Sequence, residues 1–195
     1  MDTLLGLFIG IGLSAACGFR VFVPLLITSV AAQGGHLTLS SGFDWIGTSP
    51  AVIAFATATV LEIAAYYTPW LDHLLDSITT PAAAIAGTII TASLVGDLSP
   101  FLKWSLAIIA GGGTAAAVQA GTVMTRSASL MTTGGLGNGL VATAELFGSA
   151  VVSFLALFLP VVVIIMVVLV LAFLIRRIAG RKKIPAQLGQ TRMLP

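Results

Sequence analysis

The feature that most constrains this chain is a run of 30 residues, 146–175, without a single charged side chain. A helix of that length would measure about 45 Å, whereas the hydrocarbon core of a bilayer is about 30 Å thick. Pro160 lies in the middle of the run, and proline interrupts helices. Together with residues 139–145, the run predicts two spans that meet near Leu159 and Pro160. The alternative is a single tilted helix preceded by a re-entrant segment.

The composition of the whole chain also indicates a membrane environment. Hydrophobic residues make up 57% of the 195 residues and charged residues only 8%, against about 25% charged residues in an ordinary soluble domain. A soluble fold of this size could not hide so much apolar surface from water. At about 20 residues per span, the length allows about six helices, within a range of about five to seven. We therefore predict an all-α, polytopic membrane helical bundle.

Basic residues are concentrated at the C-terminal end of the chain. Five of the nine Lys and Arg residues lie within 176–183, and Arg192 follows them. Positive clusters beside a span stay on the cytoplasmic side. We predict a transmembrane domain over residues 1–178 and a basic cytoplasmic tail over residues 179–195, in a multi-pass protein of the inner (plasma) membrane. Such clusters are typical of segments that touch anionic lipid, so nucleic-acid binding is not expected.

The first apolar stretch, residues 3–32, is too long for one upright span. Gly18 and Pro24 interrupt it, which predicts either one long kinked helix or two shorter segments. Beyond this stretch, apolar runs bounded by helix breakers predict spans over about 51–67, 82–96 and 101–124.

Two of the connecting segments have patterns of their own. Residues 70–80 combine apolar and acidic positions at helical spacing, which predicts a short amphipathic helix. Pro81 suits the first turn of the span that follows. The polar and glycine-rich segment Arg126–Asn138 predicts a loop.

The chain also contains a faint internal repetition. A helix rich in small residues leads to an arginine twice, at Arg20 and at Arg126. A span with a glutamate follows each of them, at Glu62 and at Glu145. Three spans in each half would make the halves inverted repeats, an architecture common in transporters. The sequence therefore leaves a 3+3 inverted repeat open.

Arg20, Glu62 and Glu145 are ionisable residues predicted to lie at membrane depth. A charge that faces lipid costs about 2.5–3.5 kcal/mol on insertion scales, so each must face protein, water or a partner. One interpretation is a pathway for a proton, an ion or an anionic solute, with Tyr66 beside it. The other is a structural ion pair between Arg20 and one of the glutamates. Three such groups leave one unmatched, which favours the pathway.

A second set of polar residues lies on the predicted amphipathic helix. Asp72 and Asp76 are four residues apart and share a face, with His73 adjacent. These side chains could form the cytoplasmic mouth of a pathway or hold a divalent cation. Their spacing matches no specific metal motif, and the wet face of an amphipathic helix shows such residues in any case.

Several of these residues belong to motifs that resemble a known family. The motifs are Gly18-Phe19-Arg20 with Pro24, the string EIAAYYTPWLDHLLD at 62–76, and Pro81 with Gly87. In these motifs, and over roughly residues 5–175, the chain resembles the bacterial membrane family catalogued as domain of unknown function 4126. The resemblance implies a small multi-spanning protein of the bacterial inner membrane, and it transfers no catalytic role.

Taken together, the sequence favours a transporter or channel-like protein for a small solute or ion. Glu62 would carry the proton or cation, and Arg20 would be its counter-charge or an anion ligand. The alternatives are a membrane-embedded, metal-dependent enzyme acting on a lipid or isoprenoid phosphate, and a non-catalytic assembly or scaffolding subunit. The sequence leans against an enzyme, and we expect no catalytic residue and no cofactor. The expected partners are the bilayer and a solute that the sequence does not identify, with a homo-oligomer left open.

Overall fold

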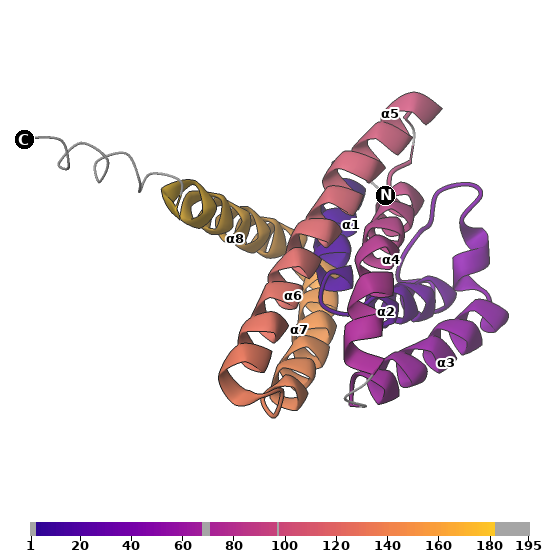
Figure 1. Ribbon diagram of the computed structural model, residues 1–195. Helices are drawn as coiled ribbons and strands as arrows, with labels where there is room; N and C mark the ends of the chain where they lie inside the picture. Colours follow the sequence, from indigo (N-terminus) through magenta and orange to yellow (C-terminus); the bar gives the residue numbers. More distant parts are fainter. Residues whose placement is uncertain (1–2, 68–70, 97, 182–195) are drawn as a thin grey trace, which may run out of the picture.

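The computed structural model describes residues 3–67, 71–96 and 98–181 (Figure 1). Within these ranges, the side chains of residues 71–75, 174–175 and 177–181 are not described. The described chain is helical and contains no strand, as predicted. Its helices are α1 (Thr3–Cys17), α2 (Phe22–Gln33), α3 (Ser49–Tyr66), α4 (Leu71–Leu94), α5 (Pro100–Leu106), α6 (Gly113–Thr133), α7 (Asn138–Phe158) and α8 (Pro160–Arg181), with a 3-10 turn η1 (Asp44–Gly47) and a π-helical segment η2 (Ala107–Gly112).

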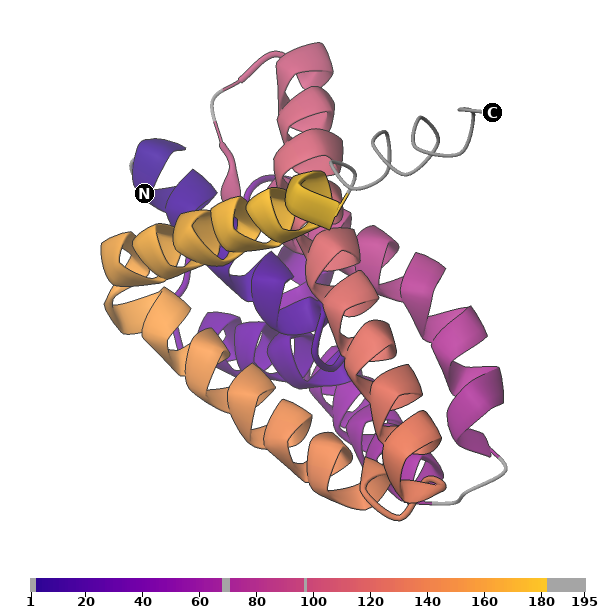
Figure 2. The same cartoon turned by 60° about the vertical axis from the view of Figure 1, so that its left-hand side comes forward.

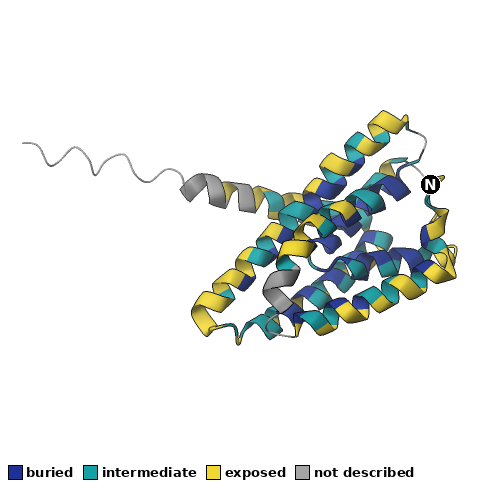
Figure 3. Cartoon of the chain, turned by 45° about the vertical axis from the view of Figure 1, so that its right-hand side comes forward, coloured by how far each residue is buried: buried dark blue, intermediate teal, exposed yellow. Residues whose placement is uncertain are grey.

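Four helical segments of the described chain are long and apolar enough to cross a membrane. They are Ser49–Tyr66, Asp76–Leu94, Pro100–Thr133 and Asn138–Phe158. Large apolar side chains stay exposed on the outside of the bundle, as a lipid-facing surface requires. Figure 3 shows this separation, with buried residues toward the centre and exposed residues along the outer faces of the helices. The helical membrane bundle is therefore confirmed, while the number of about six spans and the 3+3 repeat stay predictions.

The first apolar stretch forms two shorter helices, one of the two predicted arrangements. α1 ends at Cys17 and α2 begins at Phe22, so residues 18–21 form a tip between them. Leu5 near the start of α1 and Val30 near the end of α2 line the same apolar pocket. The second helix therefore turns back toward the end of the bundle where the first one begins, and the pair is a helical hairpin.

Close packing of small residues holds α1 in the centre of the bundle. The Ser14 hydroxyl donates to the carbonyl oxygen of Gly87 in α4 at 2.8 Å. A Cβ added to Gly87 would lie 3.0 Å from the carbonyl oxygen of Gly111, in the π-helical segment that joins α5 to α6. Such glycine contacts let membrane helices approach each other closely. On another side of the hairpin α8 crosses α1 (Figure 2), and Val163 packs over Gly12.

The prediction that Pro81 begins a span was wrong. Pro81 lies inside α4, which is continuous from residue 71 to residue 94. The predicted amphipathic helix and the predicted span over 82–96 are therefore one helix. Proline is tolerated inside membrane helices because neighbouring hydroxyl groups and helices satisfy the backbone groups that it frees. Pro81 has no amide to donate to the carbonyl oxygen of Ser77, and the Thr80 hydroxyl donates to the preceding carbonyl oxygen, that of Asp76, at 2.7 Å.

The predicted loop from Arg126 to Asn138 was also wrong over most of its length. α6 continues to Thr133, and only residues 134–137 form the turn that leads into α7. Gly134 and Gly135 have positive φ angles of 63° and 92°, which end the helix in the left-handed region that favours glycine. The polarity of the segment misled the prediction, because its arginine faces other helices instead of water.

The predicted break near Pro160 is confirmed. α7 ends at Phe158 and α8 begins at Pro160, so Leu159 is the junction between two helices. The apolar part of α8, Pro160–Phe173, is shorter than the four long candidate spans. Whether α8 crosses the membrane stays a prediction, and so does the cytoplasmic location of the basic tail, most of which lies outside the described residues.

Candidate functional site

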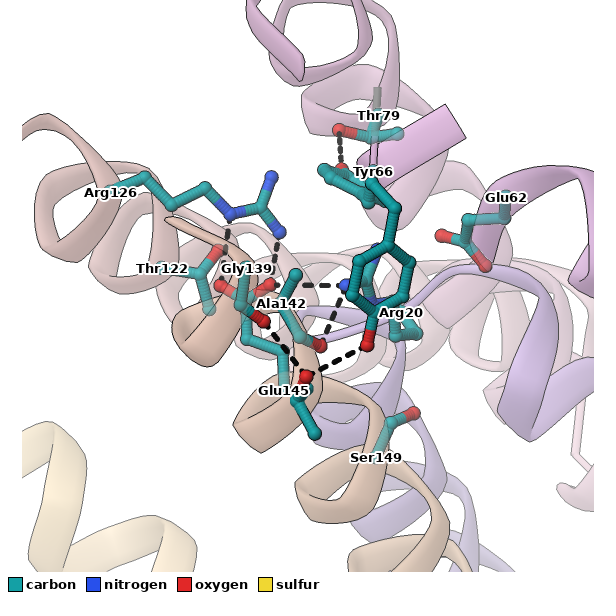
Figure 4. Close-up of polar contacts among 12 residues, drawn as sticks. Arg20, Glu62, Tyr66, Thr79, Thr122, Arg126, Gly139, Ala142, Glu145 and Ser149 are labelled. Carbon is teal, nitrogen blue, oxygen red and sulfur yellow. Dashed lines mark hydrogen bonds and ion pairs between the residues drawn. The ribbon is translucent and has the colours of Figure 1, made fainter. Parts of the chain in front are cut away.

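Six ionisable or aromatic side chains gather in the half of the bundle that contains the α6–α7 turn, and Figure 4 shows five of them. We call this group the charge cluster. The hairpin tip, α3, α4, α6 and α7 each contribute to it. Its members are Arg20, Glu62, Tyr66, Asp76, Arg126 and Glu145.

Arg126 makes the most contacts in the charge cluster. Its Nε donates to Glu145 Oε1 at 3.1 Å, and its Nη2 forms a second, very short contact with Glu145 Oε2. Its Nη1 pairs with Asp76 Oδ1 at 2.5 Å. The guanidinium is only 3% exposed. One arginine on α6 therefore binds carboxylates on both α7 and α4, in a bidentate geometry toward Glu145.

Arg20 reaches the same carboxylate from the hairpin tip. Its Nη2 donates to the carbonyl oxygen of Ala142 at 2.8 Å and lies 3.7 Å from Glu145 Oε2. The side chain is 1% exposed, and its Nε and Nη1 have no hydrogen-bond partner. Of the two ion pairs considered from the sequence, the structure contains the one with Glu145.

Tyr66 lies against both arginines. The Cζ atom of Arg20 is 3.8 Å from the centroid of the Tyr66 ring, and the Cζ atom of Arg126 is 4.0 Å from it. Such cation–π contacts are strongest where water is excluded, and the tyrosine is buried. Its hydroxyl is hydrogen-bonded to Thr79 Oγ1 at 3.2 Å, which fixes the ring against α4.

Glu62 has a different partner from the one that the sequence suggested. Its two carboxylate oxygens accept hydrogen bonds from the backbone amides of Val21, at 2.8 Å, and Phe22, at 3.1 Å. These amides are at the N-terminus of α2, where a negative charge is favourable. Glu62 therefore caps α2 from a neighbouring helix and holds the hairpin tip against α3.

The predicted cytoplasmic mouth is described only in part. Asp72 and His73 lie in the first turn of α4, but their side chains are outside the described part of the structure. Asp76 belongs to the charge cluster through its pair with Arg126. Among the side chains that the structure describes, no group of three His, Cys, Asp or Glu residues could hold a metal ion. Metal binding by Asp72, His73 and Asp76 stays a prediction.

A cleft opens beside the charge cluster. It has a volume of about 400 Å³ and lies between the hairpin tip, α6, α7 and α8. Its walls are mostly apolar, and Glu145 is the charged residue that lines it. The cleft is lined in part by Phe19 of the hairpin tip, Thr122 and Thr125 of α6, Val141 of α7 and Val170 of α8. The carboxylate that binds both arginines is thus also the one that reaches the cleft.

Sequence reasoning missed Arg126, because its neighbours are polar and it was assigned to a loop. Two signals pointed to it. The three charges expected at membrane depth left one carboxylate unmatched, and the internal repetition placed Arg126 in the position that corresponds to Arg20. Either signal would have placed a second arginine inside the bundle.

Comparison with known proteins identifies the family and no closer relative. No curated protein and no solved structure gives a significant match to this chain. The family described as "Domain of unknown function (DUF4126)" matches residues 7–179. This range contains the hairpin, the charge cluster and nearly all of α8, and it confirms the resemblance seen in the sequence motifs. The chain therefore belongs to the family Domain of unknown function (DUF4126).

Proposed function

We propose that this membrane protein is a transporter or channel-like protein for a small solute or ion, and that the charge cluster controls its pathway. The observation that carries the proposal is the position of Glu145. It borders the cleft, and the same carboxylate binds Arg126 and lies 3.7 Å from Arg20. A proton or a solute that reached Glu145 from the cleft would therefore meet the group that holds the charge cluster together.

The helical hairpin supports the same function. Irregular backbone at membrane depth is tolerated only where protein buries it or where it lines a cavity. Here the tip carries Phe19 into the wall of the cleft and Arg20 into the charge cluster. Interrupted helices whose ends meet inside the membrane form the substrate sites of many transporters.

Both arginines have partners besides Glu145, so Glu145 could take up a proton or a solute without leaving a bare positive charge facing lipid. Arg126 binds two carboxylates at once, so it keeps Asp76 as a partner if Glu145 is neutralised. Arg20 keeps the carbonyl oxygen of Ala142 and the ring of Tyr66. Neutralising Glu145 therefore loosens the contact between α6 and α7 at a modest cost, which is what a gate requires.

On this geometry we assign the role of proton or cation carrier to Glu145 in place of Glu62. Both oxygens of Glu62 are occupied by the backbone amides of Val21 and Phe22, so a proton there would weaken the cap of α2. Glu145 is bonded by side chains that have other partners, and it borders a cleft. Glu145 would then both form a structural ion pair and belong to the pathway, two roles that the sequence presented as alternatives.

Flux through proteoliposomes tests the proposal. The purified protein is reconstituted with a trapped pH-sensitive dye, and a potassium gradient with valinomycin drives proton movement. Parallel vesicles measure tracer sodium, chloride and phosphate. We expect flux of at least one of these probes, and we expect Glu145→Gln to reduce it by about tenfold or more, as loss of a proton-carrying group does.

Asp44→Asn is the matched control, because Asp44 is an exposed carboxylate in the loop before α3. It should leave the flux unchanged. A Glu145→Gln protein that folds normally and transports the same probe at the wild-type rate would remove Glu145 from the mechanism. Wild-type vesicles that move none of the four probes above the rate of empty vesicles would contradict the assignment of transport.

A further inference from the structure

A second polar site lies apart from the charge cluster, at the end of the bundle where α5 begins (Figure 1). It is a pocket of about 420 Å³ between the segment 38–41, the end of α4 and α5. Unlike the cleft at Glu145, it contains a lysine, and hydroxyl groups and apolar residues complete its lining. Its polar lining comes from Thr38, Ser40, Ser41 and Lys103.

Lys103 is an isolated cation in this half of the bundle. It is the only Lys or Arg in the sequence between Arg20 and Arg126. Its Nζ donates to Ser40 Oγ at 2.7 Å and lies 4.8 Å from the centroid of the Phe43 ring. In the described part of the chain no carboxylate lies within ion-pair distance of it. The ammonium group lines the pocket and, among the described residues, faces no carboxylate.

The hydrogen bonds of Ser40 leave donor groups of Lys103 available. The Ser40 amide donates to the carbonyl oxygen of Ser93 at 2.7 Å, and the Ser40 hydroxyl donates to the carbonyl oxygen of Ala92 at 3.0 Å. The serine thus fixes the segment 38–41 to the end of α4. It accepts one bond from Lys103, whose ammonium has three donors, so two remain for another acceptor.

Aromatic residues place this pocket at the membrane surface. Trp104 follows Lys103 directly and is 45% exposed, with its ring centroid 6.3 Å from that of Phe43. Trp45 in η1 is 50% exposed. Tryptophan collects at the level of the lipid headgroups, where an amphipathic ring meets both lipid and water. Lysine also extends toward this level, and the acceptors that every bilayer presents there are phosphate oxygens.

We propose that the pocket formed by Thr38, Ser40, Ser41 and Lys103 binds a phosphate group, as presented by the headgroup of an anionic phospholipid. Lys103 supplies the charge, and the hydroxyl groups of Thr38 and Ser41 supply further donors. A lysine ammonium recognises phosphate as a point charge without requiring a fixed bidentate geometry. The site does not depend on the proposed transport function, because it shares no residue with the charge cluster.

Lipid retention measured by native mass spectrometry tests this site. The full-length protein in mild detergent is titrated with dioctanoyl phosphatidylglycerol, with dioctanoylglycerol, which lacks the phosphate, and with inorganic phosphate. We expect Lys103→Gln to weaken binding of phosphatidylglycerol by about tenfold or more, since a charge-assisted hydrogen bond is lost. Ser41→Ala should weaken it by about threefold to tenfold, and Lys103→Arg should retain most of it.

The basic C-terminal segment also attracts anionic lipid, so the charge-matched control is Arg176→Gln, at an exposed position of α8. Arg176→Gln should not change the part of the phosphatidylglycerol binding that Lys103→Gln removes. If inorganic phosphate binds the wild type as well as the lipid does and Lys103→Gln abolishes both, the ligand is a free anion and the lipid source is overturned. If Lys103→Gln and Ser41→Ala both retain wild-type binding of the lipid and of phosphate, the site itself is overturned.

Discussion

Replacing Arg126 with methionine should destabilise the protein more than changes at any exposed charge. The side chain is 3% exposed, and its guanidinium binds Glu145 twice and Asp76 once. Methionine fills much of the same volume but leaves both carboxylates without this partner. Removing one partner of a buried ion pair costs about 3–5 kcal/mol, and insertion scales give about 2.5–3.5 kcal/mol for one unpaired acid at membrane depth. Both estimates predict a loss of about 3 kcal/mol in the free energy of unfolding.

The measurement is reversible unfolding in mixed micelles, with dodecyl sulfate as the denaturant and helix content followed by circular dichroism. Arg176→Met is the control, because Arg176 is an exposed arginine of α8, and it should change the free energy by less than about 0.5 kcal/mol.

The double variant Arg126→Met with Glu145→Leu tests the physical reason. It removes one of the two carboxylates that Arg126→Met leaves without this partner, so it should recover part of the loss, reduced by the cost of separating Arg20 from Glu145. A loss below about 1 kcal/mol for Arg126→Met alone would refute the reasoning, because it would mean that water or other donors already satisfy these carboxylates.

Three further predictions use the same protein. Glu62→Gln should lower the free energy of unfolding by about 1–2 kcal/mol, since an amide offers one acceptor oxygen where the carboxylate offers two to the amides that begin α2. Gly87→Ala should lower the free energy of unfolding by about 1–3 kcal/mol, because a Cβ there would lie 2.7 Å from a neighbouring Cβ. Gly121→Ala is its control and should be neutral or slightly stabilising, because no atom lies within 4 Å of the added Cβ. Because Asp76 of the predicted cytoplasmic mouth pairs with Arg126 in the half of the bundle that contains the α6–α7 turn, we expect a membrane-impermeant thiol reagent to label Leu136→Cys from the cytoplasmic side and Ser41→Cys from the opposite side of sealed vesicles.

The overall architecture was predictable because lipid leaves few choices. A chain with 57% hydrophobic residues and a charge-free run over 146–175 must satisfy its backbone within helices. The breaks at Gly18 and at Pro160 were also predictable, since glycine and proline weaken helices wherever they occur. For these features, the local sequence and the surrounding lipid demand the same structure.

Pro81 and Arg126 show where such reasoning fails. Proline favours the first turn of a helix, but helices inside membranes also tolerate it in their interior, and α4 continues through Pro81. Arginine favours a loop only when it has no buried partner, and Arg126 has two. For Arg126, contacts between segments far apart in the sequence override the local preference, and a single sequence does not reveal them.

The difference between Glu62 and Glu145 has the same origin. Each follows an arginine and lies in a span rich in small residues, so the sequence does not distinguish their surroundings, and we assigned the carrier role to Glu62. The hairpin separates them. Because α2 turns back along α1, the first amides of α2 bind Glu62. Arg20, in the tip of the hairpin, lies beside Glu145 in the other half of the chain.

The pairing across the two halves of the chain has a mechanical consequence. Glu62 from α3 and Glu145 and Ala142 from α7 hold the hairpin tip. Gly18 of the tip packs against α6, where a Cβ added to it would lie 2.6 Å from the carbonyl oxygen of Ala115. The tip cannot move without changing its contacts with three helices together. Of these contacts, Glu145 borders the cleft between α6, α7 and α8, so a ligand in that cleft reaches it first. In the proposed mechanism, a ligand that neutralises Glu145 would change the ion pairs of Arg20 and Arg126 and leave the cap of α2 intact. The tip would then be able to separate from α7 while it stays attached to α3.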